Sequence, residues 1–284
     1  MNITQEQMDL LSTLKSERIR DVDVSLIQTI KGAVIGGKES GLVNLFRGIR
    51  NADDDKKDIV ASYVVLSPQN VVLGFYSLRC GELYRQVDLL KMELCANAWD
   101  GLIKLRANPN MRKEEQFPLL AAIQRAMQAG ITSPDEWQRF YLKKASYLRD
   151  KKDWSGSNIE QVSEVLPGIE LKYFGVNEDA KELWASFGLP KRMGETLFWH
   201  SVVDKIEEVC NRVGCQYLYL FAADNKPDGN LVGYYNARLH FEKESDLNAN
   251  KPHFDFKCRF MCQDVETLRK NKAYFYDHFN VKDV

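Results

Sequence analysis

The 284-residue sequence lacks long apolar runs, and no stretch approaches the ~20 residues that a membrane-spanning helix needs. The N-terminal residues Met1 to Glu6 have neither the basic region nor the apolar stretch of a signal peptide. Excess charge is also lacking, because the formal net charge is −1, so no overall field draws the protein toward nucleic acid or an anionic membrane. We therefore expect a cytoplasmic protein without a membrane partner.

Cysteine is scarce, and its spacing is not that of a metal site. Six cysteines in a chain without a secretory signal are expected to be reduced thiols. Cys210 and Cys215 are five positions apart, and Cys258 and Cys262 are four apart, so neither pair has the C-x-x-C spacing of a zinc site. The spacing favours ordinary buried thiols, and we predict no metal.

The first half of the chain divides into three parts. Residues 1–50 are expected to be helical, as part of the core or as a cap, because apolar residues recur at helical spacing after a Thr4 cap. The charged run 51–58 predicts a loop. A β-hairpin then follows over residues 59–66 and 71–78, and Ser67-Pro68-Gln69-Asn70 supplies its turn. Gly74 in the second strand predicts a bulge or the close approach of another backbone.

A change of period indicates a helical insertion over residues 82–157. One apolar stripe starts at Leu83 and continues through Val87 and Leu90. A second helix is expected from Pro118 to Ala129, followed by a third after the capping box that begins at Ser133. The insertion interrupts a core that we place at residues 51–284.

The remainder alternates strands and helices, which is typical of the α/β class. Strands are expected at residues 168–176, 216–223 and 254–262, the last with a period of two. Helices are expected at 195–213, ended by Gly214, and at 231–239. The 195–213 helix carries one apolar face made of Trp199, Val202, Ile206, Val209 and Val213.

The start of the 195–213 helix is a candidate anion site. Free backbone amides and the helix dipole both favour an anion at such a position. Lys191 and Arg192 add two cations just before it. This combination suggests a cofactor that bears a pyrophosphate, although the physical argument does not name it.

Four segments, which cover roughly half the chain, resemble elements of the GNAT N-acetyltransferases in the right order. They are VLGFYSL (72–78) for the third strand, PGIELKYFGVN (167–177) for the fourth, YLYLFAAD (217–224) for the fifth, and LVGYYNARLHF (231–241) for the helix and turn that follow. The resemblance implies a GNAT-like fold, in which a mixed, mostly antiparallel sheet is flanked by helices. It also implies acetyl-CoA as the co-substrate, with its pantetheine arm bound by the backbone of Phe174, Gly175 and Val176.

The pyrophosphate loop departs from the GNAT pattern of Arg or Gln, two residues, Gly, one residue, then Gly or Ala. The nearest register is Lys191-Arg192-Met193-Gly194-Glu195-Thr196. Only the glycine matches, because lysine replaces the first residue and threonine the last. By the same resemblance, Asn225 would contact the cofactor, although capping of a loop explains this residue equally well.

The resemblance also implies the residues that would move protons. Glu170 is the candidate base, although it could equally be a strand-edge carboxylate in a hydrogen bond. Tyr235 is the candidate acid, and Tyr234 is an alternative because the spacing to Leu239-His240-Phe241 is one residue longer than usual. A buried tyrosine with one hydrogen bond would account for Tyr235 without catalysis.

Two functions are consistent with these observations. The first is transfer of an acetyl group from acetyl-CoA to a primary amine by direct attack on the thioester. The acceptor is unknown and could be a small molecule, a protein or an aminoacylated tRNA. The near-neutral net charge argues mildly against nucleic acid, tRNA included, unless a local cationic groove is present. The second is a catalytically weakened GNAT-fold protein whose helical insertion contacts a partner. The sequence leaves a homodimer open.

Overall fold

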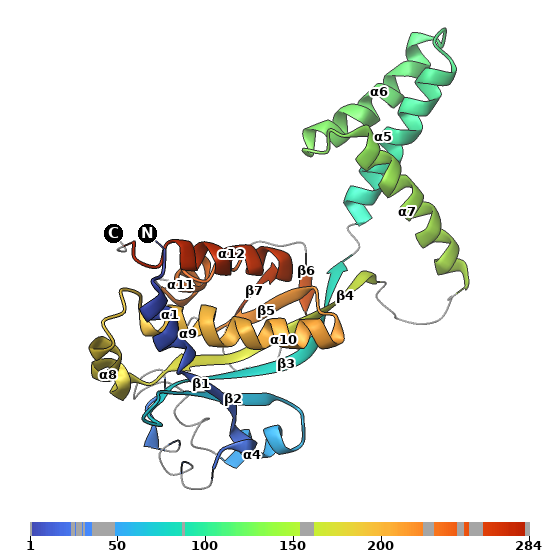
Figure 1. Cartoon of the computed structure of the whole chain (residues 1–284). Coiled ribbons are helices and arrows are strands. Elements are labelled where there is room, and N and C mark those ends of the chain that lie inside the picture. The colour runs from blue at the N-terminus through green and yellow to red at the C-terminus, as the bar shows by residue number, and fades with distance from the viewer. Residues whose placement is uncertain are drawn as a thin grey trace. The chain divides into compact units, whose positions relative to one another are not determined.

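The computed structural model describes residues 2–23, 26, 30, 32–35, 49–86, 89–153, 162–223, 230–242, 247–249 and 258–281. The chain forms two units, which we describe separately. The first comprises Met1–Tyr84 and Val165–Val284, and the second comprises Arg85–Glu164 (Figure 1). No helix in the described part of the chain is both long and apolar enough to cross a membrane.

An open sheet forms the centre of the first unit. Its strand order is β1-β2-β3-β4-β5-β7, and β6 pairs with β3, which gives seven strands in the described residues. The pairs β1–β2, β2–β3 and β5–β7 are antiparallel, whereas β4 and β5 are parallel. This is the predicted mixed, mostly antiparallel sheet. The strands are β1 (Lys15–Arg18), β2 (Ala61–Leu66), β3 (Val72–Gln86), β4 (Val162–Val176), β5 (Tyr217–Ala222), β6 (Leu247–Ala249) and β7 (Arg259–Asp264).

The predicted hairpin is confirmed as β2 and β3. The β2–β3 register shifts between Val65 and Leu66, opposite Gly74. A Cβ added at Gly74 would lie 3.1 Å from the carbonyl oxygen of Gly175 and 2.8 Å from Leu197 Cδ1. Both expectations for Gly74 are therefore confirmed, since it sits at a bulge and the end of β4 approaches its backbone closely.

Helices cover the sheet, and the main apolar cluster lies against one of its faces. This cluster includes residues of α1, of the α9–α10 region and of α12, together with Ile169 and Leu171 of β4 and Leu218 and Leu220 of β5. The helices of this unit are α1 (Gln5–Ser12), α4 (Ile49–Lys56), α8 (Lys181–Ser186), α9 (Met193–Leu197), α10 (Val203–Val213), α11 (Asn230–Ala237) and α12 (Val265–Asp277), with 3-10 turns η1 (Ile19–Asp21) and η3 (Glu178–Ala180) and a π-helical turn η4 (Phe198–Val202) between α9 and α10.

Part of the N-terminal segment differs from the helical expectation. Helix α1 begins after Thr4, whose side chain accepts a hydrogen bond from the backbone of Gln7 at 3.2 Å, as the predicted cap requires. Residues 15–18, however, form the edge strand β1, which pairs with β2. The sequence Lys-Ser-Glu-Arg has no apolar alternation, so nothing local indicated a strand.

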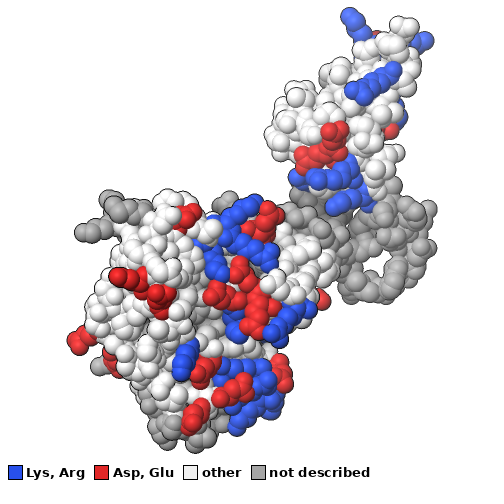
Figure 2. Space-filling view, viewed as in Figure 1, with Lys and Arg blue, Asp and Glu red and all other residues white. Residues whose placement is uncertain are grey.

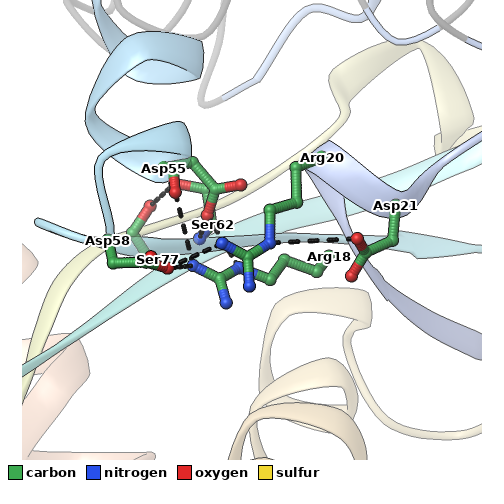
Figure 3. Close-up of polar contacts among 7 residues, drawn as sticks. All are labelled: Arg18, Arg20, Asp21, Asp55, Asp58, Ser62 and Ser77. Carbon is green, nitrogen blue, oxygen red and sulfur yellow. Dashed lines mark hydrogen bonds and ion pairs between the residues drawn. The ribbon is translucent and has the colours of Figure 1, made fainter.

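The prediction of a loop for the charged run 51–58 is also wrong, because residues 49–56 form helix α4. Asp55 of α4 is buried, and its Oδ1 atom accepts hydrogen bonds from Arg18 Nε at 3.0 Å and from the backbone of Ser62 at 2.9 Å (Figure 3). A buried carboxylate is tolerated when it is paired. Its partner comes from β1, far away in the sequence, so the local charge pattern was misleading.

The second half follows the predicted order of strand, helix, strand, helix and strand, with differences in detail. Gly214 ends α10 in the left-handed conformation, with φ of 72°, as expected. Val213 is 64% exposed and does not share the buried face of its helix. Met261, Cys262 and Gln263 are all buried, so burial in the last strand does not alternate strictly. The segment 178–190, between β4 and α9, contains α8. Residues 254–257 of the last predicted strand lie outside the described residues.

The second unit consists of three helices, α5 (Leu89–Ala107), α6 (Lys113–Gln128) and α7 (Pro134–Asp153). Its small core contains Cys95, Ala98, Ala126, Ile131 and Trp137. The indole of Trp137 donates a hydrogen bond to the carbonyl of Ile131 at 2.9 Å. The helical stripe does not begin at Leu83 as expected, because β3 continues to Gln86, and α6 begins five positions before Pro118.

The described surface mixes charges of both signs. On the face seen in Figure 2, lysine and arginine side chains alternate with carboxylates over the first unit. Lys272 of α12, for example, lies 2.5 Å from both Asp204 and Glu207 of α10. This face presents no continuous field of one sign, in keeping with the near-neutral net charge.

Candidate functional site

Strands β4 and β5 separate in the middle of the sheet. Their parallel ladder consists of three pairs, from Gly168–Tyr217 to Glu170–Tyr219. Beyond this point β4 continues to Val176, while β5 continues to Ala222 and stays paired with β7. The backbone groups of β4 that face β5 after Glu170 therefore have no ladder partner in β5. Such groups can hydrogen-bond an extended ligand.

A helix starts beside the end of β4. α9, η4 and α10 follow one another without a break, and no side chain caps the first of them. A Cβ added at Gly194, in the first turn of α9, would lie 3.4 Å from Val176 Cγ1 of β4 and 3.0 Å from the hydroxyl of Tyr234 of α11. The structure thus brings together three residues predicted for the site, Val176, Gly194 and Tyr234.

The two cations before this helix have different surroundings. Arg192 is exposed and forms no ion pair with the described residues. Lys191 is buried, and its Nζ donates a hydrogen bond to the carbonyl of Val281 at 3.1 Å. Arg192 is therefore the cation that remains accessible at the start of the helix.

The other residues of the predicted loop are buried. Thr196 is fully buried, and its hydroxyl donates to the carbonyl of Arg192 at 3.0 Å, so its bulk does not project into solvent at the helix start. Met193 belongs to the main apolar cluster. Glu195 is 6% exposed, and its charge is one of the causes that raise the pKa of Tyr234.

The adjacent tyrosines of α11 point to different surroundings. Tyr235 packs against Phe241 with ring centroids 6.0 Å apart, and burial raises its pKa to about 12. The Tyr234 hydroxyl instead faces Gly194, and its pKa is raised by burial, then by Tyr235 and Glu195. Both phenols stay protonated at neutral pH, and Tyr234 is the one that reaches the start of the helix.

A polar row crosses three strands of the sheet and consists of Arg79 of β3, Glu170 of β4 and Tyr219 of β5. The Glu170 side chain is 4% exposed, and its Oε2 atom accepts two hydrogen bonds from Arg79, from Nε at 2.9 Å and from Nη2. The described residues form no hydrogen bond with its Oε1 atom. Tyr219 is the ladder partner of Glu170 in β5; burial, and then the charge of Glu170, raise the pKa of Tyr219 to about 12.

A pocket of about 670 Å³ opens beside this row, lined by Arg79, Cys80, Gly81, Glu82, Val165, Pro167 and Tyr219. Gly81 makes room for Tyr219, because an added Cβ would lie 2.0 Å from its hydroxyl. Sequence reasoning gave none of these lining residues a role in the site, although Pro167 and Tyr219 fall in segments that resemble GNAT strands. Arg79 directly follows the predicted strand 71–78, but no local signal showed that this strand lies beside the strand of Glu170.

Three predicted cofactor residues remain. Phe174 packs edge-on against Phe198 at 6.0 Å, and the carbonyl of Gly175 is directed toward Gly74. Asn225 lies outside the described residues. Among the described residues, no group of three or more His, Cys, Asp or Glu side chains is arranged to hold a metal ion.

No protein-family model matches the sequence, and the search of the curated proteins gave no match. Similar solved structures include a bacterial toxin with 11% identity, which covers 92% of this chain and 96% of that chain with a TM-score of 0.48. A mutant of the AtaT toxin has 12% identity over 91% and 93% of the two chains, with a TM-score of 0.47. AtaTR bound with AcCoA has 13% identity over 92% and 98%, with a TM-score of 0.45.

Proposed function

We propose that this chain is an acetyl-CoA-dependent N-acyltransferase of the GNAT type, which transfers an acetyl group to a primary amine. The observation that carries the proposal is the separation of β4 and β5 beyond the Glu170–Tyr219 pair. An extended pantetheine arm carries amides that would pair with those backbone groups of residues 174–176 that have no ladder partner in β5. The amides at the start of α9, with the Arg192 side chain, would hold the pyrophosphate.

Glu170 is the proposed base, and Arg79 positions it. Because Arg79 donates both hydrogen bonds to Oε2, the Oε1 atom is left to accept a proton from the substrate ammonium, directly or through a water. The amine nitrogen then forms a bond to the thioester carbonyl carbon, and the C–S bond breaks. The pocket beside Arg79 and Tyr219 would hold the amine acceptor.

Tyr235 is the proposed acid, and Tyr234 remains the alternative. A group that donates a proton to a departing thiolate must be protonated at neutral pH, and the raised pKa values of both tyrosines meet this requirement. The Tyr234 hydroxyl faces Gly194, at the end of the site where the pyrophosphate is placed, whereas the thiolate would leave at the opposite end of the pantetheine arm, near Glu170. The contact with Gly194 therefore does not favour Tyr234 as the acid, and substitution of each tyrosine distinguishes the two.

Release of free thiol from acetyl-CoA tests this function. The acceptors should include small amines, a lysine peptide and an aminoacylated tRNA. Tyr235→Phe should lower kcat by about 100-fold or more, which is the usual contribution of a general acid, while Tyr234→Phe should change it by less than about threefold. The reverse result would assign the acid to Tyr234, and equal effects of the two substitutions would assign it to neither. Absence of acetyl transfer to every acceptor would contradict the proposed activity.

Two observations favour the second candidate, a GNAT-fold protein with a weakened cofactor site. Glu195 places a buried carboxylate in the first turn of α9, where a phosphate would have to bind. Lys191 is held by the carbonyl of Val281 and is not free to contact a phosphate. Under this reading acetyl-CoA would bind weakly or not at all, while the fold would be unchanged.

A further inference from the structure

The outer face of α6 in the helical unit is apolar. Phe117 is 74% exposed, Leu120 is 52% exposed and Met127 is 51% exposed. With Gln124, which is also exposed, they follow a spacing of three, four and three positions. This is the a/d spacing of a heptad repeat, so the four side chains form one seam along the helix.

The inner face of the same helix is apolar too, but its residues are small. Ala122 and Ala126 are buried, and a Cβ added at Gly101 of α5 would lie 3.0 Å from the carbonyl oxygen of Leu119. α6 therefore packs on α5 closely through these small side chains, with Ile123 also packed against the core, and directs Phe117, Leu120 and Met127 outward. A surface helix that is covered on one face usually directs its large apolar side chains toward that face. The large apolar side chains exposed on the outer face of α6 therefore indicate that a partner covers this face too.

We propose that the outer seam of α6 pairs with α6 of a second copy of this chain, in the antiparallel direction. The 3-4-3 spacing reads the same from either end. A two-fold axis across the middle of the helix would therefore place Phe117 opposite Met127 of the second copy and Leu120 opposite Gln124. The seam is thus complementary to itself, as the interface of a two-fold dimer must be.

The helix dipole and one pair of charges favour the antiparallel direction. Glu114 lies in the first turn of α6 and Arg125 near its other end, and neither forms an ion pair with the described residues. Arg112 and Lys113 offset the charges of Glu114 and Glu115, so the start of the helix is neutral overall. An antiparallel pair opposes the two helix dipoles and brings Glu114 of each helix toward Arg125 of the other.

The size of the seam predicts weak association. Stable complexes bury about 800 Å² on each partner, and a contact between single helices buries less. A dissociation constant of about 10 to 100 μM is therefore expected, and concentration is the variable to scan.

Sedimentation velocity of the full-length protein from about 1 to 300 μM tests the proposal. The sedimentation coefficient should rise with concentration. Leu120→Glu should weaken association by about 100-fold, because pairing would bury an unpaired carboxylate. Leu142→Glu on α7 is the matched control, because Leu142 is 60% exposed and lies outside the seam, and it should leave association unchanged. A monomer at every concentration, or equal effects of the two substitutions, would overturn the proposal.

Cross-linking tests the direction of pairing. In a Cys80→Ser background, which removes the exposed cysteine, a Leu120→Cys variant is mixed with a Gln124→Cys variant under mild oxidation. The mixed disulfide should form faster than either disulfide between identical variants. Faster cross-linking between two Leu120→Cys chains would indicate parallel pairing and would overturn the antiparallel assignment.

Discussion

Asp55 and Asp58 both bind the guanidinium of Arg18, and their different burial gives a quantitative prediction (Figure 3). The Asp55 side chain is 1% exposed, and its Oδ1 atom accepts hydrogen bonds from Arg18 Nε and from the Ser62 backbone. Asp58 is 68% exposed and also binds Arg20. The same aspartate-to-asparagine change at the two positions therefore compares a buried ion pair with an exposed one.

We expect Asp55→Asn to lower the free energy of unfolding by about 3 kcal/mol, because it leaves the mostly buried Arg18 charge without its buried partner. Asp58→Asn should cost less than about 1 kcal/mol, since exposed ion pairs contribute little. The Asp58 backbone has φ of 56°, a conformation that asparagine also adopts, so the second change adds no backbone strain.

Urea unfolding measures both variants. With a slope of about 2 to 3 kcal/mol/M, the midpoint should fall by about 1 M for Asp55→Asn and by less than about 0.4 M for Asp58→Asn. Equal shifts, or a larger shift for Asp58→Asn, would show that burial does not set the strength of these pairs. The attachment of α4 to β1 would then need another explanation.

Two further predictions concern pH and the polar row. Burial lowers the pKa of His200 below its ordinary value of 6.5, so the unfolded chain takes up the proton first, and stability should fall as the pH drops below 6.5. His200→Gln should show a smaller loss of melting temperature between pH 7.5 and pH 5.5, and an unchanged loss would contradict this assignment. Gly81→Ala should displace the Tyr219 hydroxyl, cost about 1 to 3 kcal/mol and slow any transfer reaction. A variant with wild-type stability and activity would show that the contact at Gly81 is unimportant.

The parts of the fold that sequence could predict depend on local patterns. The β2–β3 hairpin, the close approach at Gly74 and the end of α10 at Gly214 follow from short-range signals, namely β-branched runs and the conformational freedom of glycine. The order of strands and helices in the second half was predicted for the same reason, because each element carries its own period.

The parts that sequence could not predict depend on distant partners. Helix α4 was taken for a loop because the Arg18 side chain that pairs with Asp55 lies in β1, and β1 itself has no apolar alternation. Arg79 was missed because its role depends on Glu170, which the fold brings to the neighbouring strand. The two tyrosines of α11 could not be separated by spacing alone, because only the fold shows which one faces Gly194.

Binding of acetyl-CoA tests the central claim most directly. Isothermal titration should detect binding to the wild-type chain, and a concentration of a hundred times the dissociation constant should stabilise it by about 2.7 kcal/mol in a thermal-shift assay. Arg192→Glu should weaken binding by about 10-fold or more, because it reverses the charge at the proposed pyrophosphate site. Arg212→Glu is the matched control, since Arg212 is 76% exposed at the opposite end of the same helical stretch, and it should leave binding unchanged. No binding at millimolar acetyl-CoA, or equal losses in the two variants, would contradict the proposed cofactor site.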